Sequence, residues 1–240
     1  MALAADIVPA LNPSLNRALI GTVFRHNGRV HIENVLTPDS ADRIVQCLQS
    51  EADYVLNVTT PDGVRRVRRE QNNPAQLAQV GRMAEEVARG GFAFQYDKHP
   101  MSDAGEPYPD PNHYLAAVTQ FLNAEPFLQF CREVTGLKDI VRADAQATCY
   151  RPGHFLTRHD DDVGGLQRLV AYVLNFTPAW NPDWGGLLLF TDERGHVQEG
   201  YAPAWNALNL LKVPQTHAVS LVAPFAGGFR YSITGWLRGR

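Results

Sequence analysis

The chain has 240 residues, of which 45% are hydrophobic and 20% charged, as expected of a globular protein with a sizeable core. Its net charge of -3 excludes a general attraction to nucleic acid or anionic membranes, and no apolar run approaches the ~20 residues of a bilayer span. The first residues lack the pattern of a signal peptide, and the three cysteines are scattered like reduced thiols. We therefore expect a cytoplasmic protein without a membrane or direct nucleic-acid partner.

The first 140 residues alternate between short strands and helices. Strands are expected at 30–35, 54–58 and 92–96, and helices at 76–89, 114–122, 126–134 and from the Thr-Pro-Asp-Ser start at 37–40. A loop rich in Pro, Asp and Gly is expected over 99–112, after the strand at 92–96. The basic run Arg65–Arg69 is typical of a solvated face, with an acidic partner or ribosomal RNA as the alternative. This half is interpreted as an α/β support.

From residue 143 the hydrophobic period changes to two. Strands are expected at 143–151, 154–161, 167–176, 185–192, 206–213, 215–223 and 229–238, separated by turn residues. Short, evenly spaced strands are typical of a sandwich or barrel. The sequence thus predicts a mainly β, α+β fold: a jelly roll (double-stranded β-helix) over 141–240 with supporting helices in 1–140, forming one domain of residues 1–240.

A His-x-Asp motif, His159 and Asp161, ends the expected strand 154–161. Residues i and i+2 of an extended strand leave one face, so both side chains can reach one cation while Asp160 and Asp162 point elsewhere. A lone motif of this kind is more often a surface pair. A second imidazole on a later strand, His217, completes the two His and one carboxylate that suit non-haem Fe(II).

The last expected strand begins with an arginine. Arg230, Ser232, Thr234 and Trp236 share one face by alternation, which argues against a surface arginine beside the Gly227-Gly228 turn. A guanidinium offers a planar fork that matches a carboxylate. Arg230 is therefore a candidate anion anchor, and Ser232 can add a hydroxyl.

These residues together resemble the 2-oxoglutarate- and Fe(II)-dependent prolyl hydroxylases, most closely the ribosomal-protein prolyl hydroxylases. The resemblance covers about the last hundred residues and rests on His159-Asp160-Asp161, Leu174-Asn175, Trp184-Gly185-Gly186-Leu187-Leu188, Trp205-Asn206, His217 and Arg230–Trp236. Eukaryotic members of the group carry a second, similar domain, whereas this sequence stops at Arg240, soon after the arginine strand.

The resemblance implies a site and a reaction. Fe(II) is expected on His159, Asp161 and His217, and 2-oxoglutarate beside Arg230, Tyr150, Ser232 and Leu174. Leu174, Leu188 and Val219 are candidates for the pocket wall, and core packing without cofactor contact is the favoured alternative for each. Oxidation of 2-oxoglutarate by O2 to succinate and CO2 is then coupled to hydroxylation of a prolyl residue in a protein, with ascorbate as a candidate reductant. A ribosomal protein is the family-based substrate.

Other targets and roles stay open. The substrate could instead be a free amino acid or a peptide natural product, and a metal-binding jelly roll without turnover is a third possibility. Tyr96, Tyr108 and Trp184 are candidate substrate contacts, with packing of the core or of a loop as the alternative for each. Asn175 either contacts substrate or caps a strand end.

Overall fold

One large antiparallel sheet forms the centre of the molecule. The computed structural model describes residues 7–103, 106–165 and 167–240, and thirteen strands within these ranges join the sheet. The strands are β1 (Arg29–Glu33), β2 (Val55–Thr60), β3 (Gly63–Val67), β4 (Phe94–Ser102), β5 (Arg142–Ala143), β6 (Ala145–Tyr150), β7 (Phe155–His159), β8 (Arg168–Asn175), β9 (Leu188–Thr191), β10 (Val197–Tyr201), β11 (Ala207–Lys212), β12 (His217–Val219) and β13 (Arg230–Arg238).

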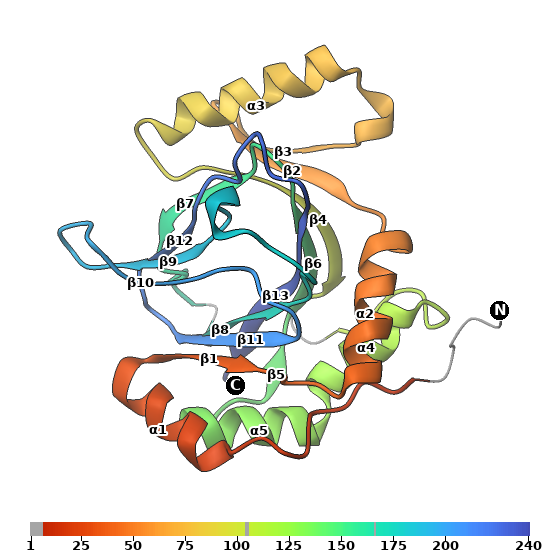
Figure 1. Cartoon of the computed structure of the whole chain (residues 1–240), viewed down its shortest axis with the longest axis vertical. Helices are drawn as coiled ribbons and strands as arrows, with labels where there is room; N and C mark the ends of the chain where they lie inside the picture. Colours follow the sequence, from red (N-terminus) through yellow and green to blue (C-terminus); the bar gives the residue numbers. More distant parts are fainter. Residues whose placement is uncertain (1–6, 104–105, 166) are drawn as a thin grey trace.

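The sheet curls until its two ends meet. Its strand order is β1-β11-β8-β13-β6-β4-β7-β12-β9-β10, and β2 with β3 extends from β4 (Figure 1). Between the end strands β1 and β10, Arg29 forms an ion pair with Glu199 and His31 stacks on Tyr201 at 4.9 Å. Side chains rather than a backbone ladder therefore close the barrel, and the jelly-roll prediction is confirmed.

Five helices within the described ranges support the sheet. They are α1 (Arg17–Asn27), α2 (Pro38–Ser50), α3 (Pro74–Ala88), α4 (Tyr114–Asn123) and α5 (Glu125–Thr135), with short 3-10 turns η1 (Arg69–Gln71) and η2 (Pro182–Trp184). A proline in the first turn favours the start of α2, α3 and α5. Proline has no backbone N–H, and an N–H at this position would have no acceptor within the helix. Asn73 and Gln76 form a capping box at the start of α3.

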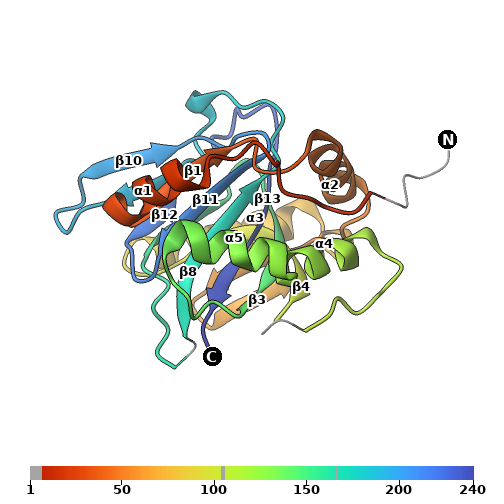
Figure 2. The ribbon, with the colours of Figure 1, turned by 90° about the horizontal axis from the view of Figure 1, so that it is seen from below.

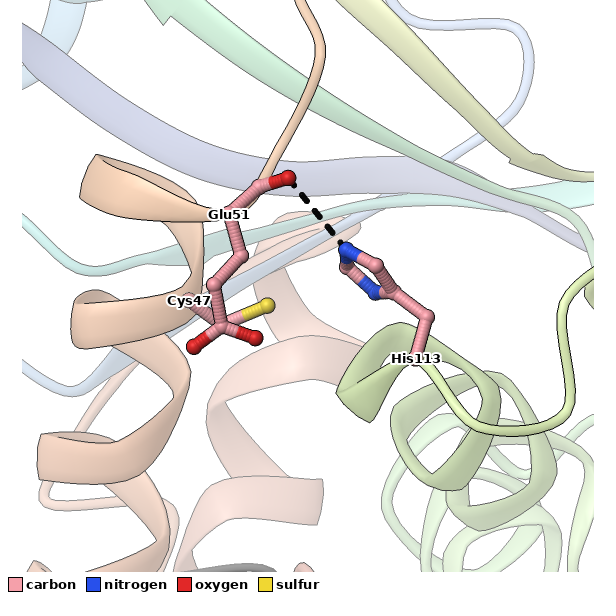
Figure 3. Close-up of side chains that lie close together, drawn as sticks. All are labelled: Cys47, Glu51 and His113. Atoms are coloured by element: carbon pink, nitrogen blue, oxygen red, sulfur yellow. Dashed lines mark hydrogen bonds between the residues drawn. The ribbon is translucent and has the colours of Figure 1, made fainter. Parts of the chain in front are cut away.

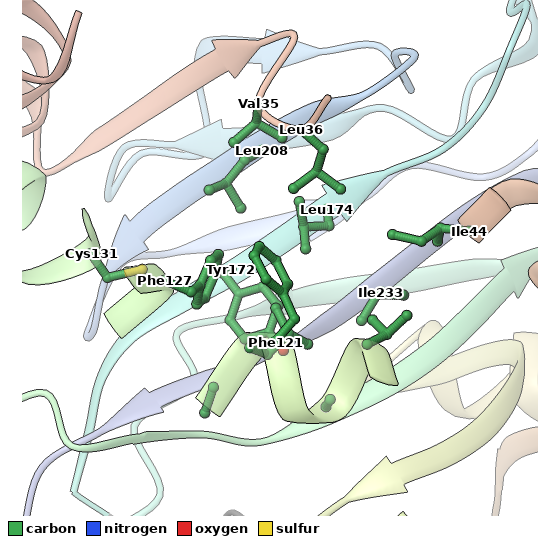
Figure 4. Close-up of a cluster of buried hydrophobic side chains, with 14 of the residues drawn as sticks. Val35, Leu36, Ile44, Phe121, Phe127, Cys131, Tyr172, Leu174, Leu208 and Ile233 are labelled. Carbon is green, nitrogen blue, oxygen red and sulfur yellow. The ribbon is translucent and has the colours of Figure 1, made fainter. Parts of the chain in front are cut away.

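The main hydrophobic core lies between the helices and the outer face of the barrel. Figure 2 shows α1, α5 and α4 on one side of the sheet, with α5 in front of β8 and β13, α1 near β1 and α4 near β4. Phe127 from α5, Leu174 from β8 and Ile233 from β13 are all fully buried in this layer (Figure 4). Alternation along β8 sends Leu174 outward to the helices and Ala171 inward to the barrel, because successive strand residues leave opposite faces.

A buried carboxylate ties three segments together outside the barrel. Asp97 of β4 is fully buried and accepts hydrogen bonds from Arg69 of η1 at 2.7 and 3.0 Å and from Arg151 after β6. Arg69 also contacts His154 at 3.0 Å. Burial lowers the pKa of His154 to about 4, so this imidazole stays neutral at pH 7 beside the two guanidiniums.

We expect Asp97→Asn to lower the free energy of unfolding by about 2–3 kcal/mol, because it leaves two guanidiniums without their buried partner. The arginine side chains are 29% and 32% exposed, so water limits the loss. Urea unfolding at pH 7 measures the effect. Asp53→Asn is the matched control, since this 63% exposed partner of Arg68 should change stability by less than ~0.5 kcal/mol. Equal effects of the two changes would contradict the role of Asp97.

The observed elements differ from the predicted ones in places. β4 runs through Pro100 to Ser102, so the expected loop 99–112 begins later, and its residues 104–105 lie outside the described part. The basic run contributes to β3 and η1, and α1 and β10 were not predicted. Strands β1 to β4 precede residue 140 yet join the same sheet, so a division near that residue stays a prediction. None of the helices in the described ranges combines the length and apolarity that crossing a bilayer requires.

Candidate functional site

The barrel encloses an open cavity of about 410 Å³. Side chains from both halves of the curled sheet line it, including Tyr96 of β4, Tyr150 of β6, Val219 of β12 and Arg230 of β13. The inward-facing positions of strands far apart in sequence therefore meet in one space.

Two histidines and one aspartate converge at this cavity. His159 ends β7 and His217 begins β12, and the two residues are direct cross-strand partners. Nε2 of His159 lies 3.4 Å from Oδ1 of Asp161, and Nε2 of His217 lies 3.4 Å from its Oδ2. One ligand atom from each residue lies within 4.8 Å of the others, a spacing that fits a single metal ion.

Backbone hydrogen bonds orient both imidazoles. Nδ1 of His159 lies 3.0 Å from the carbonyl of Thr157, and Nδ1 of His217 lies 2.8 Å from that of Gln215. A carbonyl only accepts, so each Nδ1 carries the proton and each Nε2 keeps its lone pair. Metal-binding histidines are commonly fixed this way. Burial also lowers the pKa of His217, so this imidazole is held neutral.

Asp161 reaches the histidines through a turn and not through alternation along a strand. β7 ends at His159, and Asp161 has a left-handed backbone with φ of 64°. The convergence that the sequence analysis expected is present, but a tight turn after the strand produces it. Burial alone would raise the pKa of Asp161, yet its interactions with His159 and His217 leave it below its usual value. Asp160 and Asp162 are exposed.

The cavity wall also contains a buried cation that has no anionic partner in the described part of the chain. Arg230 is 2% exposed, and its guanidinium donates to the carbonyl of Gly186 at 2.9 Å. Its Nε has no hydrogen-bond partner, and no described carboxylate lies within ion-pair distance. Burial lowers its pKa, which reflects the cost of a charge out of water. Such a cation predicts an anionic ligand in the cavity.

Polar groups surround this guanidinium. Ser232 is the next residue of β13 after Arg230 that faces the cavity, and its Oγ is 2.8 Å from Oγ1 of Thr148. The Tyr150 ring lies 5.2 Å from the Arg230 guanidinium carbon and stacks on Tyr96. Burial raises the pKa of Tyr150, so its phenol stays protonated and can donate a hydrogen bond. The region therefore offers cationic and neutral donors to one carboxylate.

Four of the predicted residues lie away from the cavity wall. Leu174 packs in the helix-side core because β8 presents Ala171 and Val173 to the barrel instead. Tyr108 bonds to His99 at 2.8 Å and packs on the same core. The amide of Asn175 donates to the Ala207 carbonyl at 3.3 Å, as a strand-pairing residue would. Trp184 packs edge-on against Trp180.

Tyr96, Leu188 and Val219 do line the cavity, as predicted. The sequence analysis missed Phe92 and Arg168, which line the cavity and each contact one residue of the metal-ligand group. The Phe92 ring lies 5.4 Å from that of His159. Nη1 of Arg168 donates to the Asp161 carbonyl at 3.3 Å. Phe92 alternates with Phe94 and Tyr96, which also line the cavity, so the expected strand 92–96 contained a signal for it. Arg168 alternates with Leu174, which faces the helices, so alternation gave no signal for it.

A second group with metal-ligand atoms connects α2 to the start of α4. Cys47, Glu51 and His113 lie close together, and Figure 3 shows His113 bonded to the backbone carbonyl of Glu51. Its other ring nitrogen accepts from the N–H of Leu115, and the Glu51 carboxylate is paired with Arg43 at 2.6 Å. Burial raises the pKa of Cys47 to about 12. Hydrogen bonds and an ion pair already occupy His113 and Glu51, and we interpret the cluster as a structural network.

Comparisons with known proteins agree with this geometry. Residues 145–238 match the family model of the 2OG-Fe(II) oxygenase superfamily. Prolyl 3-hydroxylase OGFOD1 of Mus musculus is 31% identical over 122 residues, which are 48% of this chain and 22% of the mouse protein. This chain thus spans less than a quarter of that relative's length.

Solved structures of similar fold cover nearly the whole chain. A prolyl-4-hydroxylase from Pseudomonas putida has a TM-score of 0.58 at 20% identity, covering 93% of this chain and 99% of its own. A prolyl hydroxylase from Trichoplax adhaerens, in complex with a hypoxia inducible factor peptide fragment, has a TM-score of 0.62 at 18% identity, covering 93% and 89%. At these identities the likeness establishes the fold.

Proposed function

We propose that this chain, whose residues 145–238 belong to the 2OG-Fe(II) oxygenase superfamily, is a 2-oxoglutarate- and Fe(II)-dependent dioxygenase that hydroxylates a prolyl residue in a protein. The observation that carries the proposal is the pairing of two features in one cavity. A group of two His and one Asp lines this cavity, and so does a buried guanidinium with no carboxylate in ion-pair distance among the described residues. A dicarboxylate that chelates the metal with one end can bind the guanidinium with its other end.

The residues present fit both ligands. Nε2 of His159, Nε2 of His217 and the Asp161 carboxylate would hold Fe(II), since all three donors are unprotonated and face one point. The bound metal would supply the oxidation of 2-oxoglutarate by O2, which yields succinate, CO2 and a hydroxylated product. Ascorbate would serve as reductant for enzyme that loses its ferrous state.

The protein's own contribution is to bind, orient and exclude water. Arg230 would take the carboxylate of 2-oxoglutarate that lies away from the metal, with Ser232 and the Tyr150 phenol adding hydrogen bonds. Leu188 and Val219 would cover the carbon chain. Because the guanidinium is already buried and oriented, binding spends little entropy on ordering it.

The substrate assignment rests on the relatives. The mouse relative is a prolyl 3-hydroxylase and the Trichoplax neighbour is a prolyl hydroxylase bound to a peptide, so we propose a polypeptide substrate for this chain. A ribosomal protein is the specific proposal, made on the sequence resemblance. We also propose a cytoplasmic location, consistent with Cys47, Cys131 and Cys149 as free thiols. An open cavity favours a polypeptide over a free amino acid.

An anaerobic titration tests the cosubstrate assignment. We expect Fe(II) plus 2-oxoglutarate to give the weak visible charge-transfer band of a chelated keto acid, and Fe(II) plus succinate to give none. Aerobic incubation with a cell extract should then release succinate and add one oxygen atom to proline in a target protein, detected by mass spectrometry. If saturating Fe(II) and 2-oxoglutarate produce no band, the dioxygenase assignment fails.

A further inference from the structure

A second hollow of about 490 Å³ adjoins the cavity just described. It opens between the ends of β3 and β4 on one side and those of β8 and β13 on the other. Six residues line both spaces, which places the two next to each other: Tyr96, Gln146, Arg168, Thr234, Gly235 and Trp236. A polypeptide with one residue at the metal-ligand group would therefore lay its neighbouring residues in this groove.

Three cations line the groove without a carboxylate partner. Arg66, Lys98 and Arg168 each have no carboxylate within ion-pair distance among the described residues. Other basic residues nearby are paired. Arg65 binds Asp62 and Arg238 binds Asp144, at 2.7 and 2.6 Å.

Strand pairing places Arg66 and Lys98 on the face that leads into the cavity. Arg66 of β3 lies opposite Asn57 of β2, which lies opposite Tyr96 of β4, and Tyr96 lines the cavity. Lys98 is two residues beyond Tyr96 on the same face. Lys98 also pairs across to Thr148, a cavity residue of β6. Burial and the neighbouring Arg66 lower the pKa of Lys98, and the nearby Asp103, which acts in the opposite direction, does not cancel their effect.

Arg168 connects the two spaces. Its guanidinium lies 3.5 Å from the ring centroid of Trp236, and its Nη1 donates to the Asp161 carbonyl. Its Nε is buried without a hydrogen-bond partner. The positive side of the groove therefore begins beside the metal-ligand group and continues outward to Lys98 and Arg66.

We infer that this groove binds an acidic side chain of the polypeptide substrate, with Lys98 and Arg66 receiving the carboxylate. The substrate class is then a protein segment that carries Asp or Glu close to the hydroxylated proline. This inference rests on the proposed function and adds a specificity-determining contact to it.

An acidic peptide fits the groove better than a nucleic acid. Asp103 and Glu106 also line the groove, and they would repel a continuous phosphate backbone. One carboxylate needs only the local cations, whereas a polyanion draws its affinity from many phosphate contacts. The net charge of -3 also gives no long-range attraction to nucleic acid.

Paired peptides test the inference. Each has a central proline, with a single Glu placed in turn at each flanking position, and a Gln peptide as its partner. We expect one Glu position to raise kcat/KM by about tenfold over Gln, mainly through KM, as one partly buried ion pair would. Fluorescence anisotropy of labelled peptides on the metal-free protein should show the same preference in binding, which separates recognition from chemistry.

Variants identify the residues responsible. Lys98→Met and Arg66→Gln should each reduce the Glu-over-Gln ratio towards one, and Lys98→Glu should turn the preference to a Lys peptide. Arg65→Gln is the matched control, an exposed arginine on the same strand with its own partner, and should keep the full ratio. Circular dichroism and thermal unfolding check that each variant is folded.

The outcomes distinguish the two proposals. A Glu preference in binding without hydroxylation of any peptide would support the groove and overturn the prolyl hydroxylase assignment. Hydroxylation with equal kcat/KM for every Glu and Gln pair would overturn the groove alone. Loss of single-stranded RNA binding in Lys98→Met, with no Glu preference in the parent protein, would also overturn it in favour of a nucleic-acid site.

Discussion

Succinate formation is expected to fall at least about 100-fold, to background, when Asp161 is replaced by alanine, because the metal loses its one anionic ligand. The carboxylate lies 3.4 Å from Nε2 of both His159 and His217, so its removal also leaves the two imidazoles facing each other without a bridging charge. Coupled succinate detection gives the rate. Electron paramagnetic resonance with Mn²⁺, a redox-inert probe, gives the metal affinity, which should fall in parallel.

Asp160→Ala is the matched control for this prediction. Asp160 is exposed, and its Oδ1 accepts a hydrogen bond from the N–H of Asp162 in the turn. We expect this variant to keep Mn²⁺ affinity and most of the succinate rate. If Asp160→Ala were the inactive variant and Asp161→Ala the active one, the assigned ligand would be wrong.

Residue spacing was enough to find the metal-ligand group, although the expected geometry was wrong. An i, i+2 rule selected Asp161 over Asp160 on the assumption of a continuing strand. The chain instead turns at Asp161 with φ of 64°, a backbone conformation that aspartate tolerates better than most residues. Asp161 still lies next to both imidazoles because this turn directs the second residue after His159 back towards it, and its role as a metal ligand stays a prediction.

Alternation predicted the barrel but not which side of each strand faces inward. β8 is apolar at nearly every position from Leu169 to Leu174, since one face meets the helices and the other the cavity. Nothing in such a run tells the two faces apart, and Leu174 was assigned to the wrong one. β13 was easier to interpret, because Arg230 and Ser232 mark the inward face.

The elements that were missed have weak local signals. α1 buries only Gly21 and Phe24 and exposes Leu19, so it lacks a clear apolar stripe. β10 is mostly exposed and has little alternation to detect. Both elements are held by tertiary contacts, as the Arg29–Glu199 ion pair between β1 and β10 illustrates. Contacts across the closed barrel are not encoded within any short window of sequence.

Arg230→Met should separate ligand binding from folding. In the ligand-free protein Arg230 is a buried charge without an anion, so an apolar side chain of similar length should leave the thermal midpoint unchanged or raise it. The same change should raise the KM for 2-oxoglutarate about 100-fold, the effect of losing roughly 2.7 kcal/mol of charge-assisted hydrogen bonding. The increase in thermal midpoint that Mn²⁺ and 2-oxoglutarate give the parent protein should disappear.

Arg238→Met provides the contrast on the same strand. Arg238 is similarly buried, but it already has an anionic partner, Asp144, at 2.6 Å. Its replacement should therefore destabilise the ligand-free protein, because a buried carboxylate loses its cation, and should still allow stabilisation by 2-oxoglutarate. An anion anchor is distinguished from a structural arginine by these opposite results. If Arg230→Met destabilised the ligand-free protein as Arg238→Met does and kept the parent KM, then Arg230 would be a structural residue and the cosubstrate carboxylate would bind elsewhere.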